Sequence, residues 1–145
     1  MRPGQVVLFE FPNTDLIKGK LRPALLITPV PDAYPDWLIC MISSKLHHLA
    51  DLDSIIKETD TDFSSSGLKV ESIVRVTRLA VVSENIFIGS LGEVSESRLK
   101  SIKEKISAWI LPPSSPESSK SELDTKLGEA IRYAEKNPPK ETKLE

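Results

Sequence analysis

Arg22, Ser43 and Arg75 have side chains of the kinds that bind and cleave a phosphodiester, and each borders or interrupts an apolar run. A strand is therefore expected to hold each of them. Pro23 fixes the backbone after Arg22 and favours an extended conformation there. Guanidinium groups match phosphate oxygens with paired N–H donors. The pattern predicts a phosphate-binding cleft formed by Arg22 and Arg75, faced by the hydroxyl of Ser43 or of its neighbour Ser44.

RNA brings its own nucleophile, the 2′-hydroxyl group, to such a cleft. Cleavage then needs a proton acceptor, a proton donor for the leaving 5′-oxygen and positive charge near the transition state. Arginine supplies the charge but is a poor general base, because it stays protonated. His47 and His48 are adjacent and are expected to be loop residues outside this set. The sequence leaves the proton acceptor open.

The loop before Arg22 offers further contacts to a nucleic-acid backbone, since cations flank Gly19 beside small polar side chains. The alternative interpretation is a solvated hairpin loop with ordinary surface lysines. Thr77 lies two residues after Arg75, a spacing that puts both on one face of a strand. The candidate RNA contacts share a polar or cationic side chain in the loop or at a strand: Asn13, Thr14, Lys18, Lys20, Ser44 and Thr77.

Composition sets limits on the class of protein. A chain of 145 residues is long enough for one domain with a real core. The net charge of −2 restricts any nucleic-acid site to a local patch. A single cysteine, Cys40, excludes an intrachain disulfide and a cysteine zinc site, and it is expected to be a buried thiol. With no signal-peptide pattern and no apolar run of about 20 residues, a cytoplasmic protein is expected.

Acidic residues cluster at 51, 53, 58, 60 and 62, without the spacing of a calcium loop. We expect them to form a solvated surface, and no metal site or cofactor is predicted.

Many short apolar segments alternate with turn signals up to Leu111. They predict strands at 5–11, 22–30, 37–43, 53–57 and 71–78, and a hairpin joining 79–82 to 86–91. The segment at 22–30 is almost wholly apolar, so it is expected to be buried on both faces or to pass through the core. Short strands with tight turns and few helices are typical of a small β-barrel.

One helix is predicted in this domain, from Ser95 to the end of the domain at 111. Apolar residues recur along one face at 99, 102, 106, 109 and 110, and Ser95 or Ser97 is suited to the N-cap. The helix is expected to pack against the barrel, with its lysines on the solvated face.

Composition changes after residue 111, where a proline- and serine-rich stretch begins. We therefore expect a domain at 1–111, a linker at 112–120 and a tail at 121–145. The tail contains a narrow apolar stripe for a short helix, with Ser121 and Asp124 as a capping pair. A helix of this length is marginal in water, so the tail is expected to be helical on a surface or disordered.

With these residues in place, the sequence resembles the MazF/PemK toxin endoribonucleases of bacterial toxin–antitoxin modules. The resemblance covers residues 1 to about 111. The motifs that carry it lie, in order, at 3–7, 11–16, 22–27, 42–44, 67–68 and 72–75, and at Trp109 and Ile110.

The resemblance implies an SH3-like barrel of the MazF/PemK/CcdB type that forms a homodimer, cuts single-stranded RNA without metal and is inhibited by a cognate antitoxin. The family usually attacks through the 2′-hydroxyl group, giving a cyclic phosphate. Catalytic positions map onto Arg22, onto Ser43 with Ser44 as the close alternative, and onto Arg75. Some members carry an acidic base two positions beyond the last arginine, where this chain has Thr77.

The sequence thus predicts a sequence-specific, metal-independent endoribonuclease toxin. The alternative is a non-catalytic barrel that binds nucleic acid or protein, as the related gyrase-poisoning toxins do, and Thr77 favours it. A third interpretation is a structural interaction protein. The tail helix at 121–136 is a candidate inhibitor in cis, against the alternative of a neutral extension.

Overall fold

The computed structural model describes the backbone of residues 1–10, 19–113 and 118–137, with the side chains of 118–126 left undescribed. Met1–Ile110 form one compact unit, and Leu111–Glu145 form a second. The strands are β1 (Gln5–Glu10), β2 (Leu21–Pro29), β3 (Asp36–Ser43), β4 (Ser54–Ile56), β5 (Ser72–Ser83) and β6 (Phe87–Glu93). The α-helices are α1 (Phe63–Ser66), α2 (Glu96–Ile110) and α3 (Ser118–Lys136), and short 3-10 helices span Leu46–His48 and Glu84–Ile86.

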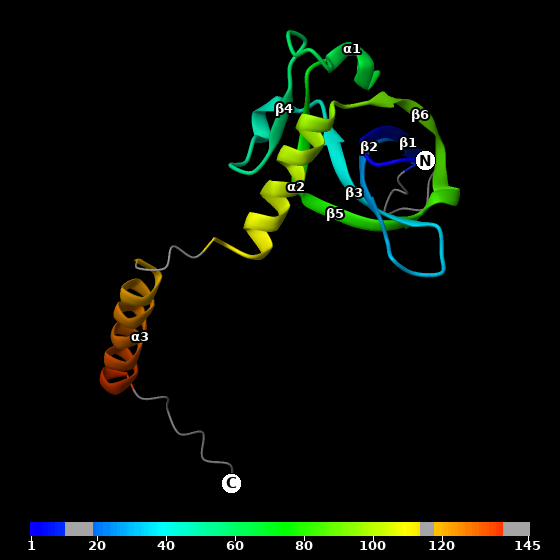
Figure 1. Cartoon of the computed structure of the whole chain (residues 1–145). Coiled ribbons are helices and arrows are strands. Elements are labelled where there is room, and N and C mark those ends of the chain that lie inside the picture. The colour runs from blue at the N-terminus through cyan, green and yellow to red at the C-terminus, as the bar shows by residue number, and fades with distance from the viewer. Residues whose placement is uncertain (11–18, 114–117, 138–145) are drawn as a thin grey trace. The chain divides into compact units, whose positions relative to one another are not determined.

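The six strands form one antiparallel sheet in the order β4-β5-β3-β2-β1-β6. The sheet curls strongly, so that β5 and β6 bend around the inner strands (Figure 1). Its edge strands, β4 and β6, do not pair with each other, which leaves the barrel-like sheet open. The expected class, mainly β with a helix packed on a small barrel-like sheet, is confirmed.

The predicted hairpin between residues 79–82 and 86–91 does not form. Residues 72–83 form one long strand, β5, which pairs along the length of β3. The pairing register shifts after the Met41–Arg75 pair, because residues 76–78 have no partners on β3. β6 pairs with β1 instead of β5. The hairpin was wrong because a local turn signal does not say which distant strand edge is free to pair.

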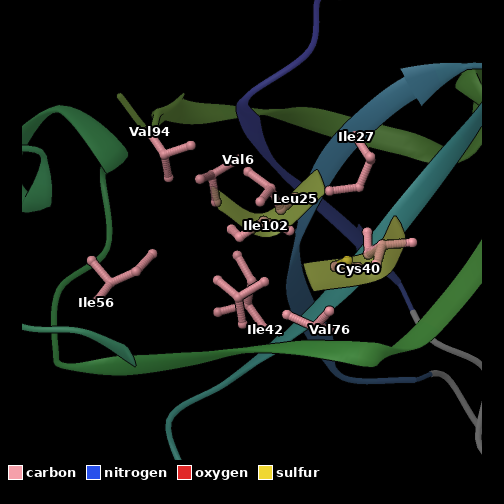
Figure 2. Close-up of a cluster of buried hydrophobic side chains, with 11 residues drawn as sticks. Val6, Leu25, Ile27, Cys40, Ile42, Ile56, Val76, Val94 and Ile102 are labelled. Atoms are coloured by element: carbon pink, nitrogen blue, oxygen red, sulfur yellow. The ribbon is translucent and has the colours of Figure 1, made fainter. Parts of the chain in front are cut away.

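The inner strands are apolar on both faces, as predicted for the segment at 22–30. Alternate residues of β2 enter two cores: Leu25 and Ile27 one, Ala24 and Leu26 the other. α2 covers the first core, where Ile102 is fully buried (Figure 2). The second core lies on the opposite face and includes Val7, Phe9, Trp37 and Ile39. The register decides which core each residue of β2 enters, because a slip of one residue would exchange the two sets.

α2 begins as the sequence predicts. The Ser95 hydroxyl accepts a hydrogen bond from the Arg98 amide at 3.2 Å, an N-cap on the first turn. Ile102 and Ile106 are buried against the sheet, whereas Trp109 and Ile110 remain 45% and 70% exposed in the single chain. The predicted apolar face is therefore covered over only the first part of the helix.

The short helix α1 was not predicted, and it lies directly against β6. A Cβ atom on Gly92 would fall 2.1 Å from the Ser65 carbonyl oxygen, and one on Gly67 would fall 2.1 Å from that of Leu91. Gly67 also ends α1 with a φ of +73°, a conformation that favours glycine. Two glycines therefore let the backbones of α1 and β6 approach closely.

In the second unit, α3 begins at Ser118, inside the range expected for the linker. It ends at Lys136, just before Pro138 and Pro139 in the sequence. Ser121, expected as a cap, lies inside the helix, because the helix starts three residues earlier than its apolar stripe suggests. Leu127 and Ile131 of that stripe are exposed.

Candidate functional site

A pocket of about 470 Å³ opens beside the beginning of β2 and the end of β3. The segment that follows α1 forms part of its wall. We call it the basic pocket. Its walls combine cations, hydroxyl groups and aliphatic side chains, and it is lined by Leu8, Lys20, Leu21, Arg22, Pro23, Ile42, Ser43, Ser44, Lys45, Gly67, Leu68, Lys69, Val70, Ser72 and Leu91.

Strand register brings Arg22 and Ser43 together. Ala24 of β2 pairs with Met41 of β3. Arg22 and Ser43 each lie two residues beyond this pair on their own strands, a spacing that puts each on the same face of its strand as its member of the pair. Both line the basic pocket. Two residues that lie 21 positions apart in the chain therefore line the same pocket.

The pocket has a uniformly positive set of ionisable groups among its described residues. Lys20, Arg22, Lys45 and Lys69 line it, and no Asp, Glu or His does. Within the described part of the chain, none of these four side chains makes an ion pair. Cations that are not neutralised by neighbouring carboxylates attract a polyanion. The net charge of the whole chain, −2, does not reveal this cationic patch, because the patch is local.

Hydroxyl groups add neutral donors to the same walls. The Ser43 hydroxyl oxygen accepts a hydrogen bond from the Lys45 amide at 3.2 Å, which leaves its proton able to donate. Ser44 also lines the pocket, so both serines considered from the sequence lie there. The Ser72 hydroxyl is already used as a donor to the Val70 carbonyl oxygen, at 2.9 Å.

Arg75 occupies a different environment. Its Nη1 lies 2.8 Å from a carboxylate oxygen of Asp53 and also donates to the His48 carbonyl oxygen. Nη2 donates to the Lys45 carbonyl oxygen at 3.4 Å. The guanidinium does not line the basic pocket. Arg75 therefore contacts the pocket wall through the carbonyl oxygen of Lys45 and not from inside the cavity.

The remaining predicted contacts divide into three groups. Lys20 lines the pocket, as described. Thr77 is exposed in the irregular stretch of β5 and does not line it. Asn13, Thr14 and Lys18 lie outside the described residues.

The expectation of a wholly solvated acidic surface was wrong for two residues. Asp53 and Asp62 are only 8% and 5% exposed, and each binds an arginine. Arg98 donates to both carboxylate oxygens of Asp62 and to one of Asp60. The paired Arg98 guanidinium lowers the pKa of Asp62 to about 2. The sequence could not show this, because the arginines come from β5 and α2, far along the chain.

Two further observations concern reactivity. Among the described residues, no group of three or more His, Cys, Asp or Glu is arranged to hold a metal ion. Burial raises the pKa of Cys40 to about 12, so this thiol is not a nucleophile at neutral pH.

Sequence reasoning missed Lys45 and Lys69 as pocket residues. Lys45 directly follows Ser43 and Ser44, which were predicted to line the site. Its position just after the end of the same strand could have identified it as a pocket residue. Lys69 follows Gly67, whose left-handed backbone turns the chain toward the pocket after α1. Only the fold brings that turn beside β2.

The first unit is thus a mainly β protein with a curled antiparallel sheet and a cationic pocket beside the ends of its strands. A profile of the family described as PemK-like, MazF-like toxin of type II toxin–antitoxin systems matches residues 2–110. The chain therefore belongs to this toxin family. The match spans the first compact unit.

Solved structures support the same fold. An endoribonuclease in complex with its cognate antitoxin from a mycobacterial species superposes with a TM-score of 0.60 at 13% identity, over 79% of this chain and 99% of that one. Toxin MazF-mt6 of Mycobacterium tuberculosis gives 0.53 at 18% identity, over 73% and 93%. The MazE-MazF structure from Deinococcus radiodurans gives 0.57 at 16% identity, over 77% and 95%. No curated protein sequence matches. In the described part of the chain, no helix has the length and apolar character needed to cross a membrane.

Proposed function

We propose that this chain is a toxin that cleaves single-stranded RNA in the basic pocket without a metal ion. The observation that carries the proposal is that Arg22, at the start of β2, and Ser43, at the end of β3, line one pocket whose described ionisable residues are all cations. Membership of the toxin family supports it, as does the fold shared with an endoribonuclease.

In the proposed reaction, the 2′-hydroxyl oxygen attacks the adjacent phosphorus and the bond from phosphorus to the 5′-oxygen breaks. The products are a 2′,3′-cyclic phosphate and a new 5′-hydroxyl end, whose proton comes from solvent. Arg22 donates to non-bridging phosphate oxygens, where negative charge grows in the transition state. The Ser43 hydroxyl group donates a hydrogen bond to the same phosphate.

The other pocket residues hold the rest of the RNA. Lys20, Lys45 and Lys69 bind flanking phosphates as point charges. Leu21 and Val70, both about half exposed, offer an apolar surface on which a base can lie. Single-stranded RNA suits such a site because its bases are unstacked and accessible. The sequence hypothesis also gives Arg75 direct contact with the RNA backbone.

Substituting Arg22 tests the proposal. In EDTA, the wild type should cut a long RNA, and Arg22→Ala should cut it at least about 10²-fold more slowly, because one transition-state donor is lost. Arg78→Ala is the matched control, since Arg78 is exposed on β5 and does not line the pocket. Equal cleavage by wild type and Arg22→Ala would remove Arg22 from the mechanism.

The pH dependence tests the proton path. Since no described pocket residue is a carboxylate or a histidine, the proposed mechanism releases the 2′-hydroxyl proton to solvent. The logarithm of the single-turnover rate should then rise with pH at a slope near one, as expected for proton loss to solvent, without a plateau between about pH 5 and 8. A plateau beginning in the acidic range would instead indicate a carboxylate base from outside the described lining.

A second function, a barrel that binds nucleic acid without cutting it, is favoured by the same missing base and by Thr77. Tight binding of RNA with no new 5′-hydroxyl ends would support that function over cleavage. In either case we propose a homodimer that works in the cytoplasm and is held inactive by a cognate antitoxin. The mycobacterial endoribonuclease with the same fold is in complex with its cognate antitoxin, which supports the last point.

A further inference from the structure

We propose that Asp53 and Arg75 form a strut that fixes the backbone of residues 43–48 at the wall of the basic pocket, so that both act on cleavage as positioning residues. The proposal rests on the proposed function, because it explains how the pocket keeps its shape for RNA. It assigns a role to Asp53, which does not line the pocket.

The contacts run from the buried aspartate to the pocket wall in three steps. The Asp53 carboxylate accepts from the Ala50 amide at 2.9 Å and from Arg75 Nη1 at 2.8 Å, through the same oxygen. Arg75 donates onward to the carbonyl oxygens of His48 and Lys45. The Lys45 amide in turn donates to the Ser43 hydroxyl. One guanidinium therefore joins β5 to both ends of the 3-10 helix that follows β3.

Burial makes this strut costly to break. The Asp53 side chain is 1% exposed and that of Arg75 is 16% exposed. Removing either partner leaves the other charge in a largely dry environment. It also removes the side-chain donor shared by the carbonyl oxygens of Lys45 and His48, which flank or belong to a segment with no buried residues of its own.

The geometry separates this role from direct phosphate binding. The donors of Arg75 already have three partners behind the pocket wall, whereas Arg22 has no ion pair in the described residues and lines the cavity. Two of the five N–H donors of Arg75 are unused in the described part of the chain, but the residue does not line the pocket, so binding a phosphate there would require the guanidinium to move. We therefore infer that Arg75 stays on Asp53 while RNA is bound.

Salt dependence of RNA binding distinguishes the two roles. Each phosphate neutralised by a protein cation contributes about −0.7 to the slope of log binding constant against log salt for a single strand. The probe is a short RNA taken from a mapped cleavage site, with a 2′-deoxy nucleotide there to prevent cleavage. Arg75→Gln should weaken binding but keep the wild-type slope, as a positioning residue requires. A slope shallower by about 0.7 would overturn the proposal, and Lys45→Gln shows the size of that change for a pocket cation.

Cleavage kinetics test Asp53. Asp53→Ala should lower kcat/KM by about 10-fold or more, and Asp53→Asn, which can keep both hydrogen bonds, should recover part of the loss. The double variant Asp53→Ala with Arg75→Gln should lose no more than the worse single variant, because both break one strut. Asp51→Asn, an exposed carboxylate in the same loop, is the matched control. Wild-type kcat/KM in a folded Asp53→Ala protein would contradict the strut.

Hydrogen exchange of the full-length chain tests this proposal independently of the proposed RNA cleavage. Amides of residues 44–50 should exchange at least 10-fold faster in Asp53→Ala than in Asp51→Asn, while the strand amides of β1 and β2 keep their protection. Failure of the wild type to cut RNA would defeat the proposed function alone. Unchanged exchange in residues 44–50 would defeat the strut, whatever the activity.

Discussion

At the scale of single residues, the arginines of the described chain serve different purposes. Arg75 and Arg98 bind buried carboxylates and join segments that are distant in sequence. Arg22 makes no such pair in the described residues and faces the pocket. The difference lies in what surrounds each guanidinium, because all three are the same chemical group. A cation is available for a ligand only where the fold has not already neutralised it.

The Arg98 pair predicts an acid-sensitive contribution to stability. Because the pKa of Asp62 falls from its ordinary value of 3.8 to about 2 on folding, the unfolded chain binds this proton more tightly. The stabilisation is therefore complete above about pH 4 and is lost as the pH falls toward 2. The shift corresponds to about 2 kcal/mol.

Asp62→Asn should thus lower the free energy of unfolding at pH 7 by about 2 kcal/mol and flatten its decline between pH 4 and pH 2. Urea unfolding at several pH values measures both effects. Glu58→Gln, an exposed carboxylate in the same loop, should leave the pH profile close to that of the wild type. A wild-type acid profile in Asp62→Asn would show that Arg98 does not perturb this carboxyl group.

At the scale of elements, the basic pocket depends on how α1 meets β6. The segment 67–70 reaches the pocket because α1 ends at Gly67 against the backbone of Leu91. The Ser65 hydroxyl adds a bond to the Glu93 carbonyl oxygen at 3.1 Å. A helix of four residues has almost no stability of its own, so this packing is what holds it.

Gly92→Ala should therefore destabilise the domain by roughly 2 kcal/mol or more, because its Cβ atom would lie 2.1 Å from the Ser65 carbonyl oxygen. It should also weaken RNA binding, since Lys69 and Val70 move with α1. Gly89→Ala on the same strand is the matched control, because its Cβ atom meets nothing within 4 Å. Thermal melting and RNA titration of the two variants give the comparison, and equal melting temperatures would contradict close packing of α1 on β6.

At the scale of the whole molecule, the pocket and the cores belong to the first compact unit, and α3 belongs to the second. The family match also ends at residue 110. The unit that carries the proposed chemistry thus contains its own hydrophobic cores. Exposed apolar side chains remain on α2 at Trp109 and Ile110, consistent with a surface that a partner covers.

Deleting residues 112–145 should shift the melting temperature of the first unit by no more than about 2 °C, because no described core residue is removed. We expect the RNA cleavage rate and antitoxin affinity to stay unchanged as well, as for a neutral extension. Calorimetry and cleavage of the truncated and full-length chains provide the test. A faster rate after truncation would show that the tail inhibits the pocket in cis.

The sequence by itself determined the apolar strands, the two-faced burial of β2 and the capped helix α2, and it singled out Arg22 and Ser43, which line one pocket in the fold. These features depend on local periodicity, on Pro23 and on a cap within one turn. Only the tertiary structure decided that β6 pairs with β1, that Arg75 binds Asp53, and that Lys45 and Lys69 complete the pocket. Paired strand edges, buried ion pairs and pocket walls are formed by residues that lie far apart in the chain. The spacing of residues along a single sequence does not show which distant segments come into contact.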